Sequence, residues 1–351
     1  MKPVIHVGIL SYGMSGKVFH APMLHVNPGF VISKIMQRTG SSALEQYPYV
    51  EIVRNIEDII HDPSIDVVLV NTPDHTHYDF TSRALEARKH VVVEKPFVLD
   101  VKEGESLIEL ATKKKKVLTV FQNRRWEGDF LTIRSILGHQ LLGRLVEYEA
   151  HFDRFRNFIR DSWKEKADNR TGTLFNLGSH LIDQALVLFG MPSGVYADIR
   201  KQRTGAQVDD LFDLTLYYPD VKVTLKGSYL VREQGPRFLI HGTEGSFVKY
   251  GADPQEEALN AGRFPNEAGW GTEPEDQWGI LNTTISGLHY RGKIETLPGC
   301  YHQFYNELYE TLTSGKDITV NPRESLNGIK IILAAYESSI KHAAIDPARF
   351  S

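Results

Sequence analysis

The sequence contains a single cysteine, Cys300, among its 351 residues. One cysteine can form no internal disulfide bond and no cysteine-rich metal site. His75 and His77 stand close together, but two histidines without further ligands are weak support for a metal site, so we expect no metal. The lack of disulfides is typical of the reducing cytoplasm, where we expect the protein to reside.

Long hydrophobic runs and a strong excess of charge are missing as well. No stretch is long and apolar enough for a membrane helix, and the first apolar run, residues 4–10, lacks the cleavage site of a signal peptide. The formal net charge of -4 is small for this length. The basic run at residues 113–116 is better explained as the solvated end of a helix. We therefore expect neither nucleic acid nor a membrane as a partner.

The first third of the chain alternates short apolar strands with helices. Near-continuous apolar strands in such an alternation indicate a doubly wound parallel sheet, a Rossmann domain. Because 351 residues favour two domains, we place the first at residues 1–121. The predicted strands are 4–10, 30–36, 67–71, 90–93 and 117–121. One predicted helix follows the first strand and ends at residue 26, and two further helices span 76–87 and 101–114.

The remainder, residues 122–351, is predicted to form an α/β domain with a large, mainly antiparallel open sheet. Residues 145–250 alternate apolar and polar side chains, the pattern of a sheet with one covered face. We expect this domain to bind the substrate and to pack its open face into a homodimer or homotetramer. The stretch 251–287, rich in glycine and proline, is predicted to be an ordered excursion or surface loop. The predicted strands are 195–203, 211–218, 221–227 and 238–241, and the predicted helices are 176–189, 300–313 and 323–342.

A glycine-rich turn follows the first predicted strand. Residues 8–16 resemble the pattern G-x-G-x-x-G, with Ser11 in place of the first glycine of the turn. Between a strand and a helix, such a turn holds the pyrophosphate of a dinucleotide on free backbone N–H groups. The turn alone also allows a tight strand–helix connection that binds nothing. The predicted cofactor contacts in it are Ser11, Tyr12, Gly13, Met14, Ser15 and Gly16.

The end of the second predicted strand carries Arg38 and no carboxylate before Glu45. A carboxylate at this place would bind the ribose 2′-hydroxyl of NAD. An arginine can instead pair with the 2′-phosphate of NADP. NADP is therefore favoured, with NAD as the alternative, and a merely solvent-exposed arginine is the alternative for Arg38 itself.

Polar motifs follow three further strands of the first domain. Ligands bind at the carboxyl ends of parallel strands, so these motifs are expected around the cofactor. They are N-T-P-D-H-T-H at residues 71–77, E-K-P at 94–96 and Q-N-R-R-W at 122–126.

Together with G-T-L-F-N-L-G-S-H-L-I-D-Q at residues 172–184, these motifs make the chain resemble the Gfo/Idh/MocA oxidoreductase family. Within that family it is similar to the branch of NADP-linked scyllo-inositol 2-dehydrogenases, through V-F-H-A-P at 18–22 and H-G-T-E-G-S at 241–246. The resemblance implies hydride transfer between a nicotinamide cofactor and a secondary alcohol or ketone of a cyclic polyol or sugar. Scyllo-inositol and its inosose ketone are the first pair to expect.

The resemblance also implies a role for individual residues. Lys95 matches the lysine that orients the reacting hydroxyl, and His180 matches the catalytic acid/base. The implied cofactor contacts outside the glycine turn and Arg38 are Thr72, Pro73, His77, Glu94, Lys95 and Asn123. The expected substrate contacts are Asn176, Arg125, Asp153 and Trp163.

The chain departs from the family pattern at Asn176, where the resemblance implies an aspartate. An amide can hold a substrate hydroxyl but cannot carry charge or raise the basicity of His180. Asn176 keeps one alternative open, a non-catalytic NAD(P)-binding sensor. A second alternative is an NAD-dependent glycoside hydrolase of the same family. Net production of reduced cofactor would separate a dehydrogenase from both.

Overall fold

A computed structural model describes residues 3–166 and 171–350. The chain forms two compact units, and each draws on three separate segments. Unit 1 consists of Met1–Trp126, Pro254–Gly271 and Cys300–Leu326. Unit 2 consists of Glu127–Asp253, Thr272–Gly299 and Asn327–Ser351.

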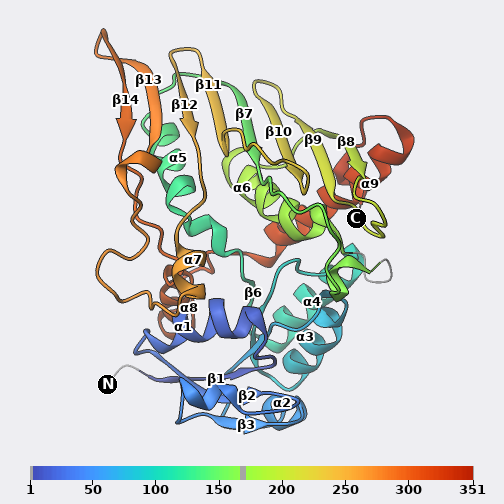
Figure 1. Cartoon of the computed structure of the whole chain (residues 1–351). Coiled ribbons are helices and arrows are strands. Elements are labelled where there is room, and N and C mark those ends of the chain that lie inside the picture. Colours follow the sequence, from blue (N-terminus) through green and yellow to red (C-terminus); the bar gives the residue numbers. More distant parts are fainter. Residues whose placement is uncertain (1–2, 167–170, 351) are drawn as a thin grey trace. The chain divides into compact units, whose positions relative to one another are not determined.

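In the described residues of unit 1, six parallel strands form one sheet in the order β3-β2-β1-β4-β5-β6 (Figure 1). The strand order reverses between β1 and β4, and the carboxyl ends at such a switch point form the usual ligand crevice. The predicted doubly wound parallel sheet is confirmed. The strands are β1 Ile5–Ile9, β2 Phe30–Met36, β3 Glu51–Val53, β4 Val67–Val70, β5 His90–Val93 and β6 Leu118–Val120.

Local sequence explains these elements well. All four residues of β4 are buried, as expected for a parallel strand covered on both faces. Helix α4, Val101–Lys114, has the predicted bounds because Asp100 caps its first turn by accepting a hydrogen bond from the Lys102 N–H at 2.8 Å. The other helices of unit 1 are α1 Ala21–His25, α2 Glu57–Ile60, α3 His77–Glu86, α7 Gln255–Asn260 and α8 Gln303–Ser314.

The sheet of unit 2 has eight strands in the part of the chain that the structure describes, in the order β14-β13-β12-β11-β7-β10-β9-β8. Only the β7–β10 pair within it is parallel, which confirms the predicted, mainly antiparallel sheet. The strands are β7 Leu145–His151, β8 Gly194–Arg200, β9 Leu211–Tyr217, β10 Lys222–Ser228, β11 Phe238–Gly242, β12 Gly245–Lys249, β13 Gly279–Ile285 and β14 Leu288–Ile294.

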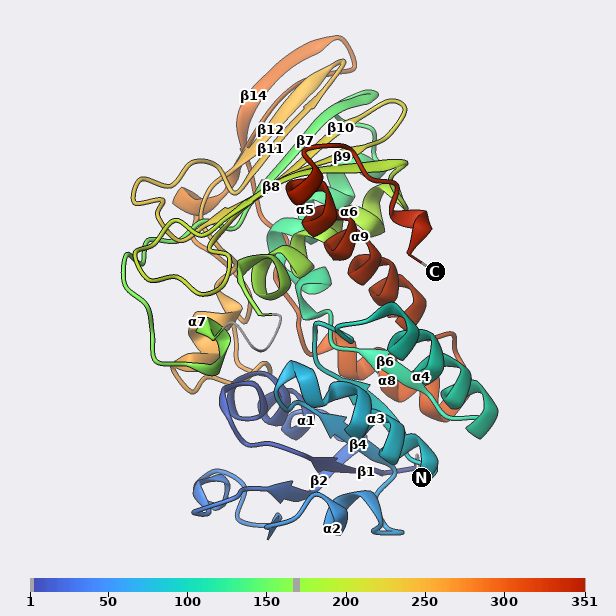
Figure 2. The same ribbon diagram turned by 90° about the vertical axis from the view of Figure 1, so that its right-hand side faces the viewer.

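One face of this sheet is covered by helices, as the alternation of side chains predicts. Along β9, Phe212, Leu214 and Leu216 are buried and alternate with more exposed residues. Helices α5 (Gly128–Gly138) and α6 (Ser179–Phe189) lie on the buried face (Figure 2). Helix α9 (Pro322–Lys341) runs along β8, where two of its serines accept hydrogen bonds from the strand's N–H groups. No helix in the described ranges combines the length and the apolar character needed to cross a membrane.

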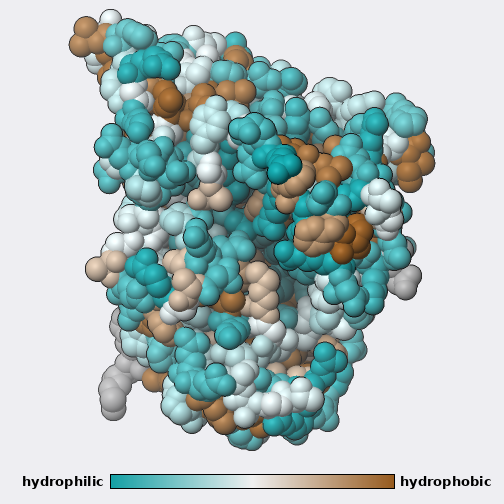
Figure 3. Space-filling model, in the orientation of Figure 1, coloured by the Kyte–Doolittle hydropathy of each residue, from teal (hydrophilic) through white to brown (hydrophobic). Residues whose placement is uncertain are grey.

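The prediction of a loop over residues 251–287 was wrong in part. The stretch contains α7 and β13, and β13 pairs with β14 through a turn at Ser286 and Gly287, which both have positive φ. The hairpin escaped prediction because β14 is an exposed edge strand without buried residues to reveal its period. Its tip carries Leu288, which is 75% exposed. Figure 3, in the orientation of Figure 1, shows hydrophobic surface at this end of the molecule.

Candidate active site

The glycine turn of unit 1 connects β1 to η1, a π-helical turn over Ser15–His20. The Ser11 hydroxyl oxygen accepts a hydrogen bond from the Gly13 N–H at 3.3 Å, so the serine itself supplies a turn contact. Ser11 does not have a positive φ. It therefore replaces a glycine without backbone strain.

The space around the two glycines fits a dinucleotide. A Cβ on Gly16 would lie 2.1 Å from the Ser11 carbonyl oxygen, so only glycine allows this packing. A Cβ on Gly13 would meet nothing closer than the Ser11 hydroxyl at 3.6 Å, which leaves its backbone open to a phosphate.

Asn71 joins this turn from the end of β4, across the switch point of the sheet. Its amide nitrogen donates to the Ser11 carbonyl at 2.8 Å. Its Oδ1 is buried and has no hydrogen-bond partner among the described residues. Because a buried acceptor without a partner is costly, Asn71 fits a bound ligand that donates a hydrogen bond there.

Arg38 lies in the exposed loop after β2, and none of the described residues pairs with its guanidinium. Arg54 instead organises this loop, since its Nη1 donates to the Gln37 carbonyl at 2.7 Å. Sequence reasoning missed Arg54 because nothing in its neighbourhood links it to the loop. Arg38 is exposed to solvent, and its contact with a cofactor stays a prediction.

Glu94 and Lys95 form the turn after β5, and Glu94 is the polar centre of this end of unit 1. Its Oε1 accepts hydrogen bonds from the Ser15 hydroxyl and from His20 Nε2, the latter at 3.0 Å, and its Oε2 accepts the Lys95 N–H at 3.0 Å. Burial works to raise the pKa of Glu94, but the hydrogen bonds and charges of His20, Ser15 and Lys95 outweigh it and lower the pKa to about 2. Glu94 is therefore a partly buried anion.

His77 connects two strand ends of unit 1. Its ring is fully buried, with Nδ1 2.8 Å from the Pro96 carbonyl and Nε2 3.0 Å from the Thr72 carbonyl. The Thr72 hydroxyl lies 2.6 Å from that of Thr76, and Pro73 precedes this turn. Both ring nitrogens of His77 face backbone, so the contacts of His77, Thr72 and Pro73 with a cofactor stay predictions.

Asn123 and Arg125 lie in η4, the buried turn Asn123–Trp126 after β6. Arg125 is only 7% exposed and donates from Nη1 to Glu324 at 2.8 Å. A substrate contact would have to use its other N–H groups, and this role stays a prediction. The glutamate partner is 199 residues away in the chain, so the sequence offered no signal for it.

In unit 2, Asn176 and His180 lie at the junction of η7 (Leu174–Gly178) and α6. His180 is buried, with its ring centroid 6.4 Å from that of Phe152. Asn176 Oδ1 accepts a hydrogen bond from Lys164 Nζ at 3.4 Å, and that ammonium lies 5.5 Å from the ring of Trp163. The structure thus brings the predicted substrate residues Trp163 and Asn176 together around a lysine that the sequence did not single out.

Asp153 follows β7 in unit 2 and is the next residue after Phe152. Its carboxylate lies 2.9 Å from His151 Nδ1 and accepts the Ser228 N–H at 3.1 Å. Burial works to lower the pKa of His151, but Asp153 and Glu149 raise it above its usual value. Substrate binding by Asp153 stays a prediction.

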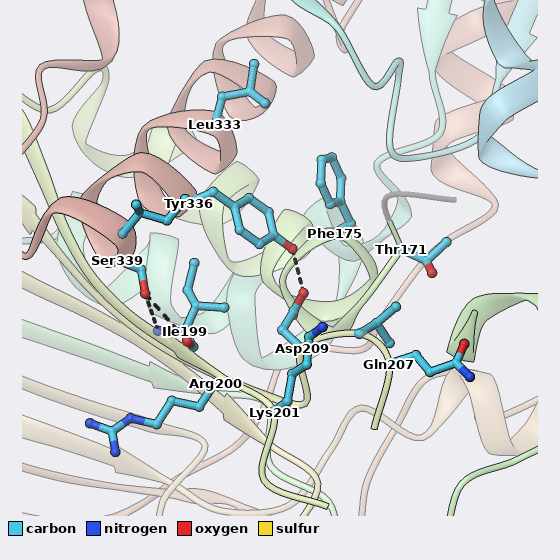
Figure 4. Close-up of a pocket in the computed structure, with 12 residues that line it drawn as sticks. Thr171, Phe175, Ile199, Arg200, Lys201, Gln207, Asp209, Leu333, Tyr336 and Ser339 are labelled. Atoms are coloured by element: carbon cyan, nitrogen blue, oxygen red, sulfur yellow. Dashed lines mark hydrogen bonds between the residues drawn. The ribbon is translucent and has the colours of Figure 1, made fainter. Parts of the chain in front are cut away.

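A cavity of about 500 Å³ in unit 2 lies beside the first turn of η7 (Figure 4). Within it, Asp209 accepts hydrogen bonds from the Tyr336 hydroxyl at 2.6 Å and the Leu174 N–H at 2.8 Å. Burial raises the pKa of Asp209. Phe175 of η7 lines this cavity. Asn176 and His180, which follow Phe175 in the chain, do not line it.

Two family profiles cover most of the chain. Residues 5–122 match the oxidoreductase family's NAD-binding Rossmann fold, and residues 134–345 match the family's C-terminal alpha/beta domain. The chain belongs to the Gfo/Idh/MocA oxidoreductase family.

Several Gfo/Idh/MocA relatives are similar over nearly their whole length. Scyllo-inositol 2-dehydrogenase (NADP(+)) IolW of Bacillus subtilis is 43% identical over 95% of this chain and 94% of its own. The solved structure of the oxidoreductase yvaA from Bacillus subtilis has a TM-score of 0.96 at 41% identity and covers 99% of both chains. That of an oxidoreductase from Bacteroides fragilis has a TM-score of 0.91 at 49% identity, covering 98% of this chain and 99% of that one.

Family membership defines the class of reaction. The protein is a dehydrogenase that acts on CH–OH groups of a small molecule, and its Rossmann domain binds a nicotinamide dinucleotide. The open backbone at Gly13 and the unpartnered oxygen of Asn71 fit that cofactor. Among the described residues, no three His, Cys, Asp or Glu side chains gather as a metal site requires.

Proposed function

We propose that the protein is an NADP-dependent dehydrogenase of a cyclic polyol or sugar, with scyllo-inositol and its inosose ketone as the first substrate pair to test. The observation that carries the proposal is the exposed guanidinium of Arg38 at the end of β2, where NADP presents its 2′-phosphate. The IolW relative, named for the NADP-linked oxidation of scyllo-inositol, supports both cofactor and substrate.

In this proposal the turn at Gly13 and Gly16, together with Arg38, would hold the nicotinamide dinucleotide, which when bound would supply the acceptor for the hydride of the substrate carbon. Lys95 orients the reacting hydroxyl and stabilises the charge that develops on its oxygen. His180 takes the hydroxyl proton as the carbon–hydrogen bond breaks, so that alcohol becomes ketone. Asn176 and Lys164 would hold neighbouring hydroxyls, since they offer both an acceptor and donors.

A panel of polyols and sugars with NADP and NAD, followed by the absorbance of reduced cofactor, tests the proposed reaction. We expect net NADPH formation with at least one cyclic polyol. Release of an aglycone without net reduction would instead identify the glycoside-cleaving alternative. Tight cofactor binding without turnover on any substrate would refute the proposed polyol or sugar dehydrogenase. It would support the alternative of a non-catalytic NAD(P)-binding sensor.

Arg38→Ala tests the choice of cofactor. A charge-assisted contact with phosphate contributes about 1.5–3 kcal/mol, so the Kd for NADP should rise roughly 10- to 100-fold. The Kd for NAD, which lacks the 2′-phosphate, should change less than about twofold. Titration of the protein's tryptophan fluorescence with NADP and with NAD measures the two values, with Arg291→Ala on the exposed strand β14 as a control. Equal losses for both cofactors would overturn the assignment.

The same proposal gives residues 1–121 to the cofactor and residues 122–351 to the substrate and to self-association in the cytoplasm. The helix-free face of the unit 2 sheet supports a homodimer or homotetramer. It carries paired charges such as Lys222 with Glu147 at 2.9 Å, and half-exposed aromatics such as Tyr196 and Tyr217. Light scattering should therefore give a mass of two or four chains, and a monomer would contradict this part of the proposal.

A further inference from the structure

A chain of hydrogen bonds in unit 1 links the glycine turn, the Glu94–Lys95 turn and helix α8. Glu94 Oε1 accepts from the Ser15 hydroxyl and from His20 Nε2 at 3.0 Å. The other ring nitrogen of His20 lies 2.7 Å from the hydroxyl of Tyr305, 285 residues later in the chain. Three segments that are distant in sequence therefore meet at one imidazole.

The π-helical form of η1 makes this contact possible. Ser15 and His20 are five residues apart, and in an α-helix such residues point roughly 140° away from each other. A π-helix closes its turn over five residues, so both side chains come close to the same face. The first turn after the glycine turn is thus shaped so that two donors reach one oxygen of Glu94.

The surroundings of His20 exclude water and leave its ring few partners. The side chain of His20 is fully buried, with its ring centroid 4.2 Å from that of Phe121. Burial raises the pKa of Tyr305 well above its usual value, so the phenol keeps its proton. The polar or charged groups around the pair are Glu94 and Lys95 from the turn after β5, Ser15 from η1 and Tyr305 from α8.

We propose that His20 is a positioning residue for Lys95. Its Nε2–H keeps the Glu94 carboxylate ionised and seated against η1, and Glu94 in turn holds the Lys95 backbone N–H at 3.0 Å. The Tyr305 hydroxyl, 2.7 Å from the opposite ring nitrogen, holds the imidazole in the orientation that points Nε2 at Glu94. His20 thereby couples the position of the catalytic lysine to the turn that binds the cofactor. This role of His20 rests on the proposed function, because its effect on kcat can be measured only if the protein has that dehydrogenase activity.

His20→Phe removes the donor and keeps a ring of similar size. We expect kcat to fall about 100-fold, the cost of a displaced catalytic group. The Kd for NADP should stay within about threefold, since backbone N–H groups at Gly13 hold the phosphates. The pKa of Glu94 should rise, so the residual kcat should show a second acid limb as Glu94 loses its proton, beside the limb that His180 gives in both proteins, whereas the wild-type Glu94 carboxylate is already ionised.

Three further variants separate positioning from simple packing. His20→Gln restores a donor towards Glu94 and should recover most of the lost kcat. Tyr305→Phe should lower kcat in the same direction but by less. His61→Phe is the matched control, because His61 also lies 2.9 Å from a glutamate, Glu57, but at the exposed surface, and it should leave kcat unchanged. Thermal unfolding of each variant verifies that it is folded.

A readout that needs no substrate completes the test. With ¹³C-labelled glutamate and Glu94→Gln to assign the signal, the Glu94 carboxyl resonance of the wild type should be constant between about pH 5 and 9. In His20→Phe it should titrate within that range. A constant resonance together with an unchanged kcat in His20→Phe would overturn the proposal. If no substrate is found, the proposed function fails, but the resonance and the NADP affinity still decide the role of His20.

Discussion

Replacement of Lys95 by alanine is expected to lower kcat about 1000-fold while the Kd for NADP changes less than about threefold. The ammonium acts on charge that develops only in the transition state, and removal of one such group typically costs 10²–10³ in kcat. Cofactor affinity should persist because the phosphates depend on the turn at Gly13 and Gly16, whose backbone the substitution does not touch. Steady-state kinetics and fluorescence titration measure the two quantities.

Lys113→Ala is a suitable control, since Lys113 is an exposed lysine in the last turn of α4. It should leave both kcat and Kd unchanged. Lys95→Arg should recover little activity, because the guanidinium is larger and planar and does not reproduce the position of an ammonium. Preserved turnover in Lys95→Ala would refute the role that we assign to this residue.

Fold prediction from the sequence was reliable where a local pattern decides the structure. β2 has its predicted bounds because its apolar residues Phe30, Ile32 and Ile35 are buried in the sheet, and α4 because Asp100 caps it. The hairpin of β13 and β14 was missed because its residues are largely exposed and carry no clear period. The π-helical starts of the two site helices, η1 and η7, were also beyond prediction, since they depend on packing rather than on propensity.

The candidate site also combines residues that local sequence motifs predict with residues that only tertiary structure brings together. The glycine turn and the Glu94–Lys95 turn are contiguous motifs at strand ends, so sequence alone indicated their place. The partners of those motifs come from tertiary structure. Tyr305 reaches His20 across 285 residues, and Glu324 reaches Arg125 across 199. No periodicity links such residues, and only the folded chain reveals them.

Replacement of His180 by asparagine is expected to lower kcat by a factor of about 10²–10⁴, the usual contribution of a positioned acid/base. Asparagine fits the buried space near Phe152 but cannot take the hydroxyl proton. The pH profile distinguishes this loss from disturbed packing. In the wild type, kcat for alcohol oxidation should fall at acid pH, because a protonated imidazole accepts no further proton, and this limb should vanish in the variant.

A substitution at the neighbouring Asn176 gives a second test of His180 as the group that takes the hydroxyl proton. His180 lies about one helical turn after Asn176, whose amide faces Lys164 and brings no negative charge. Asn176→Asp would introduce a carboxylate there, which favours the charged imidazole, so the acid limb of kcat should move to higher pH. His139→Asn, at an exposed position after α5, is the control and should leave the profile unchanged. An acid limb that persists in His180→Asn would show that another group takes the proton.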